Sequence, residues 1–183
     1  MSTKPKSQQT QKQNFNLDIP GVVIQSLLGQ GGMGQVYQGY QEFLHRHVAI
    51  KTLPKSNVDK EFTQRFQREA KILAQLSHPN IISCFDAGVN GETFYLIMEL
   101  IKGSDLNDYV SQKGALPREI ALKITLDLAK ALAYAHSKGI LHRDVKLENI
   151  LLQKNNELDP AFPYGVKLAD LGLSSESSEL NSD

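Results

Sequence analysis

A glycine-rich stretch from Gly29 to Gly34 constrains the fold of this chain most, because it reads G-x-G-x-x-G and lies between two strand-like segments. Glycine lets backbone N–H groups approach phosphate oxygens without a Cβ in the way. In dinucleotide-binding folds the third glycine of this pattern opens a helix. Here Val36 and Tyr37 continue a strand pattern, and a further strand-like run begins at His47. The sequence therefore predicts an antiparallel hairpin with a phosphate-binding turn, and an ordinary hairpin turn is the alternative.

The strand-like run from His47 to Leu53 contains Val-Ala-Ile-Lys, which places Lys51 directly after an apolar segment. A lysine at that place can bridge two phosphate groups, provided that a carboxylate holds it. The helical pattern of residues 58–76 supplies a candidate, because Glu69 lies on the flank of its apolar stripe while Glu61 lies further out. We expect Glu69 to pair with Lys51. A solvated lysine and a solvated helical glutamate are the alternatives.

A second hairpin is predicted after this helix. Its strands are expected at residues 81–85 and 93–100, with Asn90 and Gly91 as the turn. The run from Phe94 to Met98 is apolar at every position, which is typical of a central strand buried on both faces.

The next segments have helix patterns. A capping residue precedes a short helical stretch at Ser104 to Val110, and Pro117 opens a long one that ends near Lys138. The connection at residues 153–165 is polar with two prolines, and we interpret it as a surface insertion. The long helix should bury one stripe, formed by Ile120, Ile124, Leu128, Ala131, Leu132 and Ala135.

Two polar stretches lie directly beside apolar runs in the second half of the chain. The first, His142 to Asn149, contains reactive acidic, basic and amide groups and precedes Ile150 to Leu152. The second contains Asp170, which follows the strand-like residues 166–169. Short polar loops clamped between apolar segments are where a scaffold presents reactive groups. We therefore expect the chemistry of the protein at these two places.

The order of these motifs resembles that of Hanks-type serine/threonine protein kinases. The residues of the glycine-rich stretch are most similar to those of bacterial members of this family. The shared elements are the glycine-rich stretch, Val-Ala-Ile-Lys, a helical glutamate, a hinge, H-R-D-x-K-x-x-N and D-L-G. The resemblance implies a bilobal α+β fold, with an antiparallel sheet and one helix in the N-terminal lobe and a mainly helical C-terminal lobe. The implied parts are an N-terminal lobe at 17–98, a hinge at 99–103 and a partial C-terminal lobe at 104–183, after a polar tail at 1–16 that we expect to be disordered.

The resemblance implies a division of roles within the polar stretches. Asp144 would orient the substrate hydroxyl and take up its proton, and Lys146 would stabilise charge on the γ-phosphate. Asn149 and Asp170 would hold Mg²⁺, a hard cation that favours oxygen ligands. The lysine at this place resembles the serine/threonine branch of the family.

An ATP site is implied on the N-terminal side. Lys51, held by Glu69, would align the α- and β-phosphates of ATP. The glycine-rich stretch would cover these phosphates with Gly29, Gly31 and Gly34. Adenine would be enclosed by apolar side chains and held by backbone hydrogen bonds. The enclosing side chains would be Val36, Ala49, Leu151 and Met98, and the backbone groups would be those of Glu99 and Ile101.

Four further residues have packing roles by resemblance. Leu73, Cys84, His142 and Leu171 would form an apolar column that joins the two lobes, so that Cys84 is a packed residue and not a redox centre. Leu171 replaces the phenylalanine that usually follows the metal-binding aspartate, and we expect it to change the balance of active and inactive arrangements. Arg143 would pair with a phosphorylated residue in regulation.

The implied activity is transfer of the ATP γ-phosphate to serine or threonine hydroxyls of proteins, with ATP and Mg²⁺ as cofactors. A nucleotide-binding pseudokinase or regulatory module without transfer activity is the alternative. No A-P-E motif follows Asp170, so we expect a truncated domain with exposed apolar surface and weak or absent transfer by this chain.

Composition limits the other function classes. The 20 basic and 20 acidic side chains cancel, so nothing in the net charge favours a nucleic acid or an anionic membrane as partner. A single cysteine excludes an internal disulfide framework and a multi-cysteine metal site. No apolar run has the length of a membrane span, so we expect a cytoplasmic protein, with a span outside this chain left open.

Overall fold

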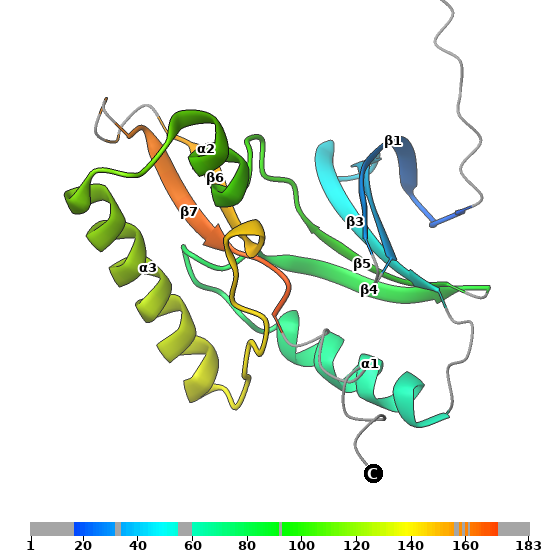
Figure 1. The fold of residues 1–183 in the computed structure, drawn as a ribbon. Helices are drawn as coiled ribbons and strands as arrows, with labels where there is room; N and C mark the ends of the chain where they lie inside the picture. Colours follow the sequence, from blue (N-terminus) through cyan, green and yellow to red (C-terminus); the bar gives the residue numbers. More distant parts are fainter. Residues whose placement is uncertain are drawn as a thin grey trace, which may run out of the picture.

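The computed structural model describes residues 17–31, 34–54, 60–91, 93–155, 158, 160 and 162–171. The expected disordered tail at 1–16 lies outside the described residues. Figure 1 shows two lobes side by side, one built on a five-stranded sheet and the other on two helices and a two-stranded sheet. The predicted α+β architecture is confirmed.

The N-terminal lobe contains an antiparallel sheet in the order β1-β2-β3-β5-β4. Gly31 pairs with Gly34 across the first hairpin, and the chain continues as a strand after Gly34, as the sequence predicted. The glycine-rich stretch is therefore part of a hairpin and does not open a helix. The strands are β1 (Val22–Gly31), β2 (Gly34–Gln41), β3 (Arg46–Pro54), β4 (Cys84–Asn90) and β5 (Thr93–Glu99).

The two central strands of this sheet, β3 and β5, are buried on both faces. On the outer face Val48, Ile50 and Ile97 pack with Ile19, which precedes β1. On the inner face the alternate side chains of the same strands enter a second cluster with α1. This confirms the prediction from the unbroken apolar run in β5, since only a strand covered on both sides needs such a run.

Helix α1 (Lys60–Leu73) covers the inner face of the sheet (Figure 1). Phe66 is 4% exposed, and the centroid of its ring lies 4.7 Å from that of Phe94 in β5. The predicted helix extended to residue 76. The observed helix ends three residues earlier because the amides of Gln75 and Leu76 bond to carbonyls only three residues back, which tightens the last turn.

The segment before β4 differs from the prediction. The expected strand at 81–85 begins only at Cys84. Instead, Ile81 forms a parallel bridge with Leu168 of the other lobe, and the Ile82 N–H donates to the Leu168 carbonyl at 3.0 Å. The backbone groups of Ile81 and Ile82 therefore pair with β7 of the other lobe, although the local apolar pattern predicted that they would belong to a hairpin strand.

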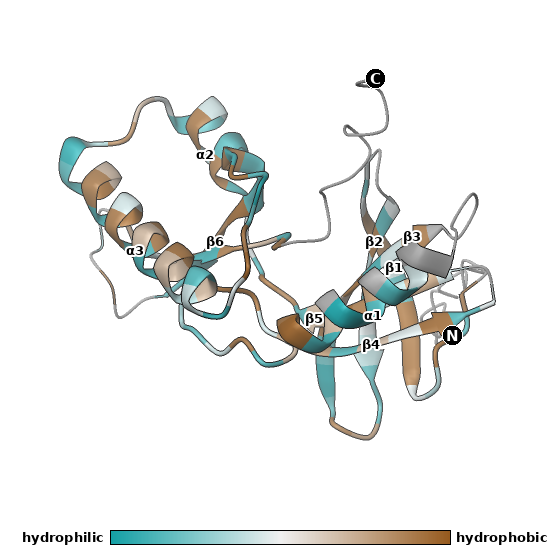
Figure 2. Cartoon of the chain, turned by 90° about the horizontal axis from the view of Figure 1, so that it is seen from below, coloured by the Kyte–Doolittle hydropathy of each residue, from teal (hydrophilic) through white to brown (hydrophobic). Residues whose placement is uncertain are grey.

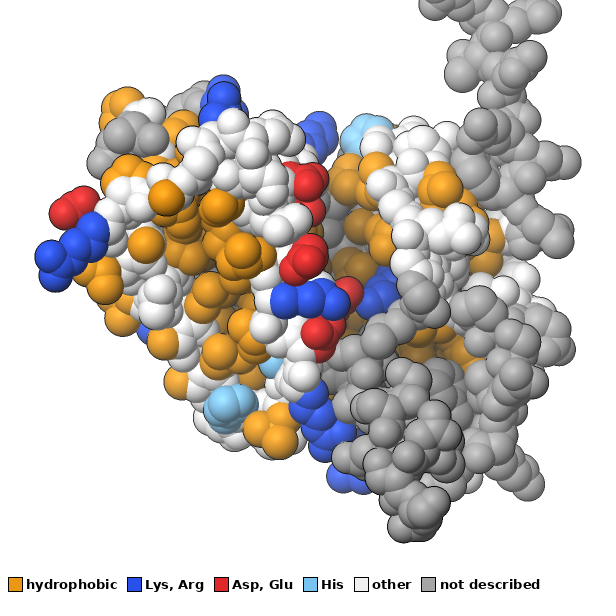
Figure 3. Space-filling view, viewed as in Figure 1, with side chains coloured by type: hydrophobic (Ala, Val, Ile, Leu, Met, Phe, Trp, Pro, Cys, Tyr) orange, Lys and Arg blue, Asp and Glu red, His pale blue; other side chains and the backbone are white. Residues whose placement is uncertain are grey.

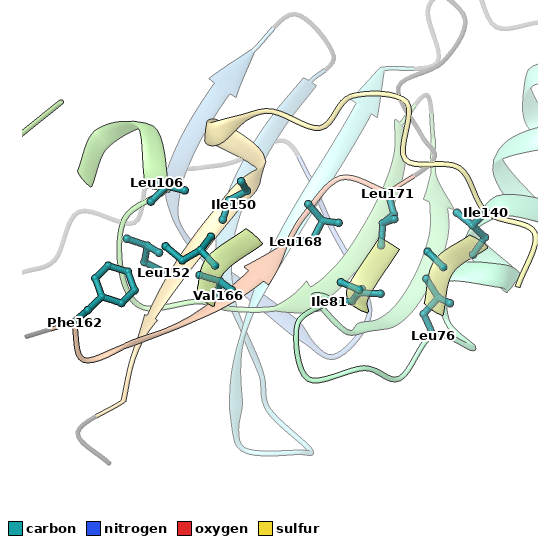
Figure 4. Packing of buried hydrophobic residues seen from close by; sticks show 13 residues of the cluster. Leu76, Ile81, Leu106, Ile140, Ile150, Leu152, Phe162, Val166, Leu168 and Leu171 are labelled. Carbon is teal, nitrogen blue, oxygen red and sulfur yellow. The ribbon is translucent and has the colours of Figure 1, made fainter. Parts of the chain in front are cut away.

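The C-terminal lobe contains α2 (Leu106–Lys113), α3 (Arg118–Ser137) and the antiparallel pair β6 (Ile150–Lys154) and β7 (Tyr164–Leu168). Asp105 caps α2, because its side chain accepts the Asp108 N–H at 2.8 Å. The core of this lobe lies between the helices and the two strands (Figure 4). All six residues of the predicted stripe on α3 belong to it or pack against it: Ile120, Ile124, Leu128, Ala131, Leu132 and Ala135.

The connection between β6 and β7 is more than a surface insertion. The strands extend to Lys154 and resume at Tyr164, so the connection is shorter than the predicted 153–165. Phe162 is only 2% exposed, and its ring packs edge-on against the rings of Tyr109 and Tyr164. The prediction of a purely surface segment was wrong at this residue, because Phe162 packs into the core of the lobe.

Candidate active site

The predicted catalytic stretch is an irregular loop that ends in a short 3-10 helix, η1 (Leu147–Asn149), directly before β6. His142 anchors the loop: it is 2% exposed, and its Nε2 lies 2.8 Å from the Ala169 carbonyl oxygen. The Asp144 N–H donates to His142 Nδ1 at 3.3 Å. These two bonds fit the neutral ring with its proton on Nε2. His142 thus does more than the predicted packing, because it ties the loop of Asp144 to the residue before Asp170.

Asp144 lies at the centre of a small polar cluster. The Lys146 ammonium is 2.9 Å from its carboxylate, and the Asn149 side-chain amide donates to its carbonyl at 2.8 Å and to its carboxylate at 3.1 Å. The hydrogen bond from Lys146 is the main reason why the pKa of Asp144 lies below its ordinary value. The same bond raises the pKa of Lys146. Asp144 is therefore held as a carboxylate.

Asp170 follows β7 and pairs with a lysine of the other lobe. Its carboxylate lies 2.8 Å from the Nζ atom of Lys51, a residue of β3 that is only 7% exposed. Asp170 has a φ of 59°, in the left-handed region that few side chains adopt. The turn directs the chain away from β7 at this point.

The backbone brings Asn149 and Asp170 to the same end of the β6–β7 pair. Ile150 pairs with Leu168, and the Ala169 N–H donates to the Asn149 carbonyl at 2.8 Å. An amide and a carboxylate are hard oxygen ligands that fit Mg²⁺. Within the described part of the chain no group of three or more His, Cys, Asp and Glu side chains could hold a metal, so a Mg²⁺ ion here would depend on these two residues and on ligands from phosphate and water.

The predicted partner of Lys51 was Glu69. Glu69 belongs to α1, but its side chain lies outside the described residues. Its pairing with Lys51 stays a prediction. The ion pair observed for Lys51, with Asp170, was not predicted.

The residues expected around the nucleotide share one face of the sheet. Val36 lies opposite Lys51, and Ala49 lies opposite Met98, so each pair projects to the same side. Ala49 and Lys51 are two residues apart on β3 and therefore also share a face. Lys51 is opposite Leu96, which belongs to the inner cluster, so this is the face that α1 covers. The pairings thus bring four of the expected residues together.

The hinge residues partly fit their expected role. The Glu99 N–H already donates to the Ser83 carbonyl at 2.9 Å, so a backbone contact of Glu99 with adenine would come from its carbonyl. Ile101 follows β5 and is partly buried. Leu151 lies in β6, opposite Lys167.

Three members of the expected apolar column meet between the lobes. Leu73, Cys84 and Leu171 line a small cavity of about 20 Å³, together with Met98 and Asp170. Burial raises the pKa of the Cys84 thiol to about 11, which agrees with a packed, unreactive residue.

One pair of side chains at this junction was missed in the sequence. The Lys167 ammonium lies 2.8 Å from the Glu99 carboxylate, and the two side chains are 14% and 22% exposed. The only sequence signal was a single charge between the apolar residues Val166 and Leu168. Figure 3 shows acidic and basic side chains next to one another along the line where the lobes meet.

Comparison with known proteins agrees with this geometry. The family model for the protein kinase domain matches residues 22–182. Serine/threonine-protein kinase PksC of Streptomyces coelicolor is 43% identical over 140 residues, which are 72% of this chain and 25% of that protein. Serine/threonine-protein kinase PknA of Mycobacterium tuberculosis is 40% identical over 156 residues, 82% of this chain and 34% of that protein.

A solved structure is also similar. The crystal structure of the Mycobacterium tuberculosis PknI kinase domain has a TM-score of 0.75 and 31% sequence identity, and the match covers 87% of this chain and 62% of that chain. The chain spans from about a fifth to about a third of the length of the curated relatives that it matches. In the described part of the chain no helix is both long and apolar enough to cross a membrane. The chain belongs to the protein kinase domain family, in its bacterial-type, Hanks-type serine/threonine branch.

Proposed function

We propose that this chain binds ATP with Mg²⁺ and provides the catalytic loop of a protein serine/threonine kinase. The observation that carries the proposal is the convergence of Lys51, Asp144, Lys146, Asn149 and Asp170 where the two lobes meet, through the contacts described above. Phosphoryl transfer depends mainly on positioning and on neutralising charge, and this set of groups suits both tasks.

The proposed reaction joins a substrate hydroxyl oxygen to the γ-phosphorus of ATP and breaks the bond from that phosphorus to ADP. Asp144 orients the hydroxyl and accepts its proton, a role for which its lowered pKa keeps it ionised. Lys146 stays protonated beside it and faces the developing charge. Bound Mg²⁺ would neutralise phosphate charge, and Asn149 and Asp170 would hold it.

The Lys51–Asp170 ion pair has a simple role in this proposal. Lys51 is almost fully buried, and a buried cation needs an opposite charge. Asp170 supplies this charge until phosphate oxygens reach Lys51. The Asp170 carboxylate would then be available to hold the metal ion.

The proposed partners are ATP and a protein with an accessible serine or threonine. Because ATP is an intracellular substrate, we place the reaction in the cytoplasm. The net charge of zero gives no reason to propose a nucleic acid as a further binding partner.

Two measurements test the proposal. Titration calorimetry of the chain with Mg–ATP should show binding, and Lys51→Met and Asp170→Asn should each weaken it by about tenfold or more, as expected for lost charge-assisted contacts. Lys154→Met is the matched control, because Lys154 is an exposed lysine at the end of β6. Absence of any Mg–ATP binding would contradict the proposal.

The second measurement is transfer of labelled γ-phosphate to serine- and threonine-containing peptides. Transfer that Asp144→Asn lowers by about 100-fold or more would support the kinase proposal. Binding of Mg–ATP without any transfer would favour the alternative, a nucleotide-binding regulatory module.

A further inference from the structure

The ion pair between Glu99 and Lys167 has no part in the proposed chemistry. Glu99 is the last residue of β5 in the N-terminal lobe, and Lys167 is the last residue but one of β7 in the other lobe. Both side chains are largely buried, with their charged atoms 2.8 Å apart. Placing two charges in such a site is costly unless they are well bonded, so their position calls for a function.

The surrounding backbone joins the same two elements. The Glu99 N–H donates to the Ser83 carbonyl, and the Glu99 carboxylate accepts the Ser83 N–H at 3.4 Å. Ile82 and Asn80 then bond to Leu168 of β7, with donor–acceptor distances of 3.0 and 2.8 Å. The Asn80 side chain adds a bond to the Val166 carbonyl at 2.9 Å. Residues 80–83 therefore connect the hinge end of β5 to β7.

A second ion pair, Lys51–Asp170, also joins the two lobes, but it runs from β3 to the residue two positions after β7. Glu99 lies opposite Val48 on β3, and Lys51 is three residues beyond Val48. Asp170 is likewise three residues beyond Lys167. At about 3.3 Å per residue, Lys51 lies about 10 Å along β3 from the residue opposite Glu99. Their polarity is reversed, since the sheet contributes an acid to one pair and a base to the other.

We infer that Glu99 and Lys167 position the loop of Asp170. The Lys51–Asp170 pair must open when phosphate and metal engage these two residues, an argument that rests on the proposed function. The proposed function assigns neither side chain of the Glu99–Lys167 pair to phosphate or metal, so the pair keeps β7 attached to the hinge while Asp170 changes partner. Glu99 thus acts through its side chain, in addition to the backbone contact expected of it.

Amide hydrogen exchange of the 183-residue chain without nucleotide tests the positioning directly. Lys167→Met should speed exchange of the amides of Ile82, Leu168 and Ala169 by about fivefold or more, because these amides bond across or beside β7. The amides of β1 and β2 should keep their rates, as should all of these amides in Lys154→Met. Unchanged exchange at the three amides would overturn the inference.

A double variant tests whether the two residues act as one unit. Glu99→Gln should reproduce the exchange pattern of Lys167→Met, and the combination should have no larger effect than either change, as expected for a shared interaction. Additive effects on exchange would show that the two residues act independently and would overturn the inference.

Nucleotide binding provides the functional readout. Lys167→Met should weaken Mg–ATP binding by about 5- to 30-fold, because Asp170 is less well placed, while adenosine binding changes by less than about twofold. Equal loss for both ligands would indicate general destabilisation and overturn the inference. If the unsubstituted chain binds no Mg–ATP, the proposed function fails, and the exchange experiment alone decides the positioning role.

Discussion

Four polar side chains of the described residues are buried, and all four lie at or beside the candidate site: Lys51, Thr52, His142 and Asn149. Each has a bonded partner, namely Asp170, the Gln35 carbonyl, the Ala169 carbonyl and Asp144. Burial of a polar group costs free energy unless it is hydrogen-bonded. These bonds therefore offset the cost of burying polar groups where the proposed chemistry takes place.

At this scale the Asp144–Lys146 pair predicts a pH effect. Lys146 lowers the pKa of Asp144, so the pair stabilises the folded chain above the ordinary carboxyl pKa of about 4, and this contribution is lost as the pH falls through the lowered value. Lys146→Met should raise the pKa of Asp144, measured by carbon NMR titration of its carboxyl group. Lys130→Met, on the exposed surface of α3, should leave it unchanged. An unchanged pKa of Asp144 in Lys146→Met would contradict the stabilising role of Lys146.

Cys84 predicts slow thiol labelling. Its pKa of about 11, against 9.0 without the protein environment, means about a hundredfold less thiolate near neutral pH. Alkylation by iodoacetamide at pH 8 should therefore be about a hundredfold slower in the folded chain than in the urea-unfolded chain. Equal rates in the two states would contradict burial of the thiol between the lobes.

At the scale of elements, Gly34 limits the first hairpin. Its φ is 137°, and a Cβ on this residue would overlap the Thr52 carbonyl of the neighbouring strand. Gly34→Ala should therefore lower the free energy of unfolding by about 1–3 kcal/mol, measured by urea denaturation. Gly31→Ala is the matched control, because nothing lies within 4 Å of the position of its Cβ. Equal stability of the two variants would contradict the observed path of β2.

The glycines of this hairpin are needed for two different reasons. At Gly34 glycine is required by the backbone of the sheet itself. At Gly29 and Gly31 the structure leaves room for a side chain, so these glycines agree with space reserved for phosphate groups. We therefore expect Gly31→Ala to affect nucleotide binding more than stability.

For the whole molecule, the C-terminal lobe exposes apolar side chains. Leu122 and Leu126 of α3 are 59% and 55% exposed. Leu141 directly before the catalytic loop and Val145 within it are 55% and 52% exposed. Figure 2 shows hydrophobic and hydrophilic residues interspersed along α3, whose other stripe enters the core. Exposed apolar surface of this kind favours association.

We expect the chain to self-associate at high concentration. In sedimentation velocity, Leu122→Gln combined with Leu126→Gln should increase the monomer fraction, because the change removes apolar area without touching the core. Phe43→Ser is the control, since Phe43 is 91% exposed on the opposite lobe. A monomer at all concentrations would contradict the expectation.

The sequence by itself determined the local motifs and the elements that present them. The glycine-rich hairpin, the lysine at the end of an apolar strand, the stripe of α3 and the loop around Asp144 follow from spacing over a few residues. Such patterns are set by backbone geometry and the side-chain period. They could therefore be predicted without knowing the neighbours in space.

Only the tertiary structure decided which distant groups meet. The pairing of residues 80–82 with β7, the burial of Phe162 and the ion pairs of Lys51 with Asp170 and of Glu99 with Lys167 join segments far apart in the chain. Glu99 and Lys167 are 68 residues apart in the sequence, and the residues around each of them do not predict that the two side chains pair. The physical reason is that an ion pair depends on the packing of the two lobes, which places both charges at one buried point.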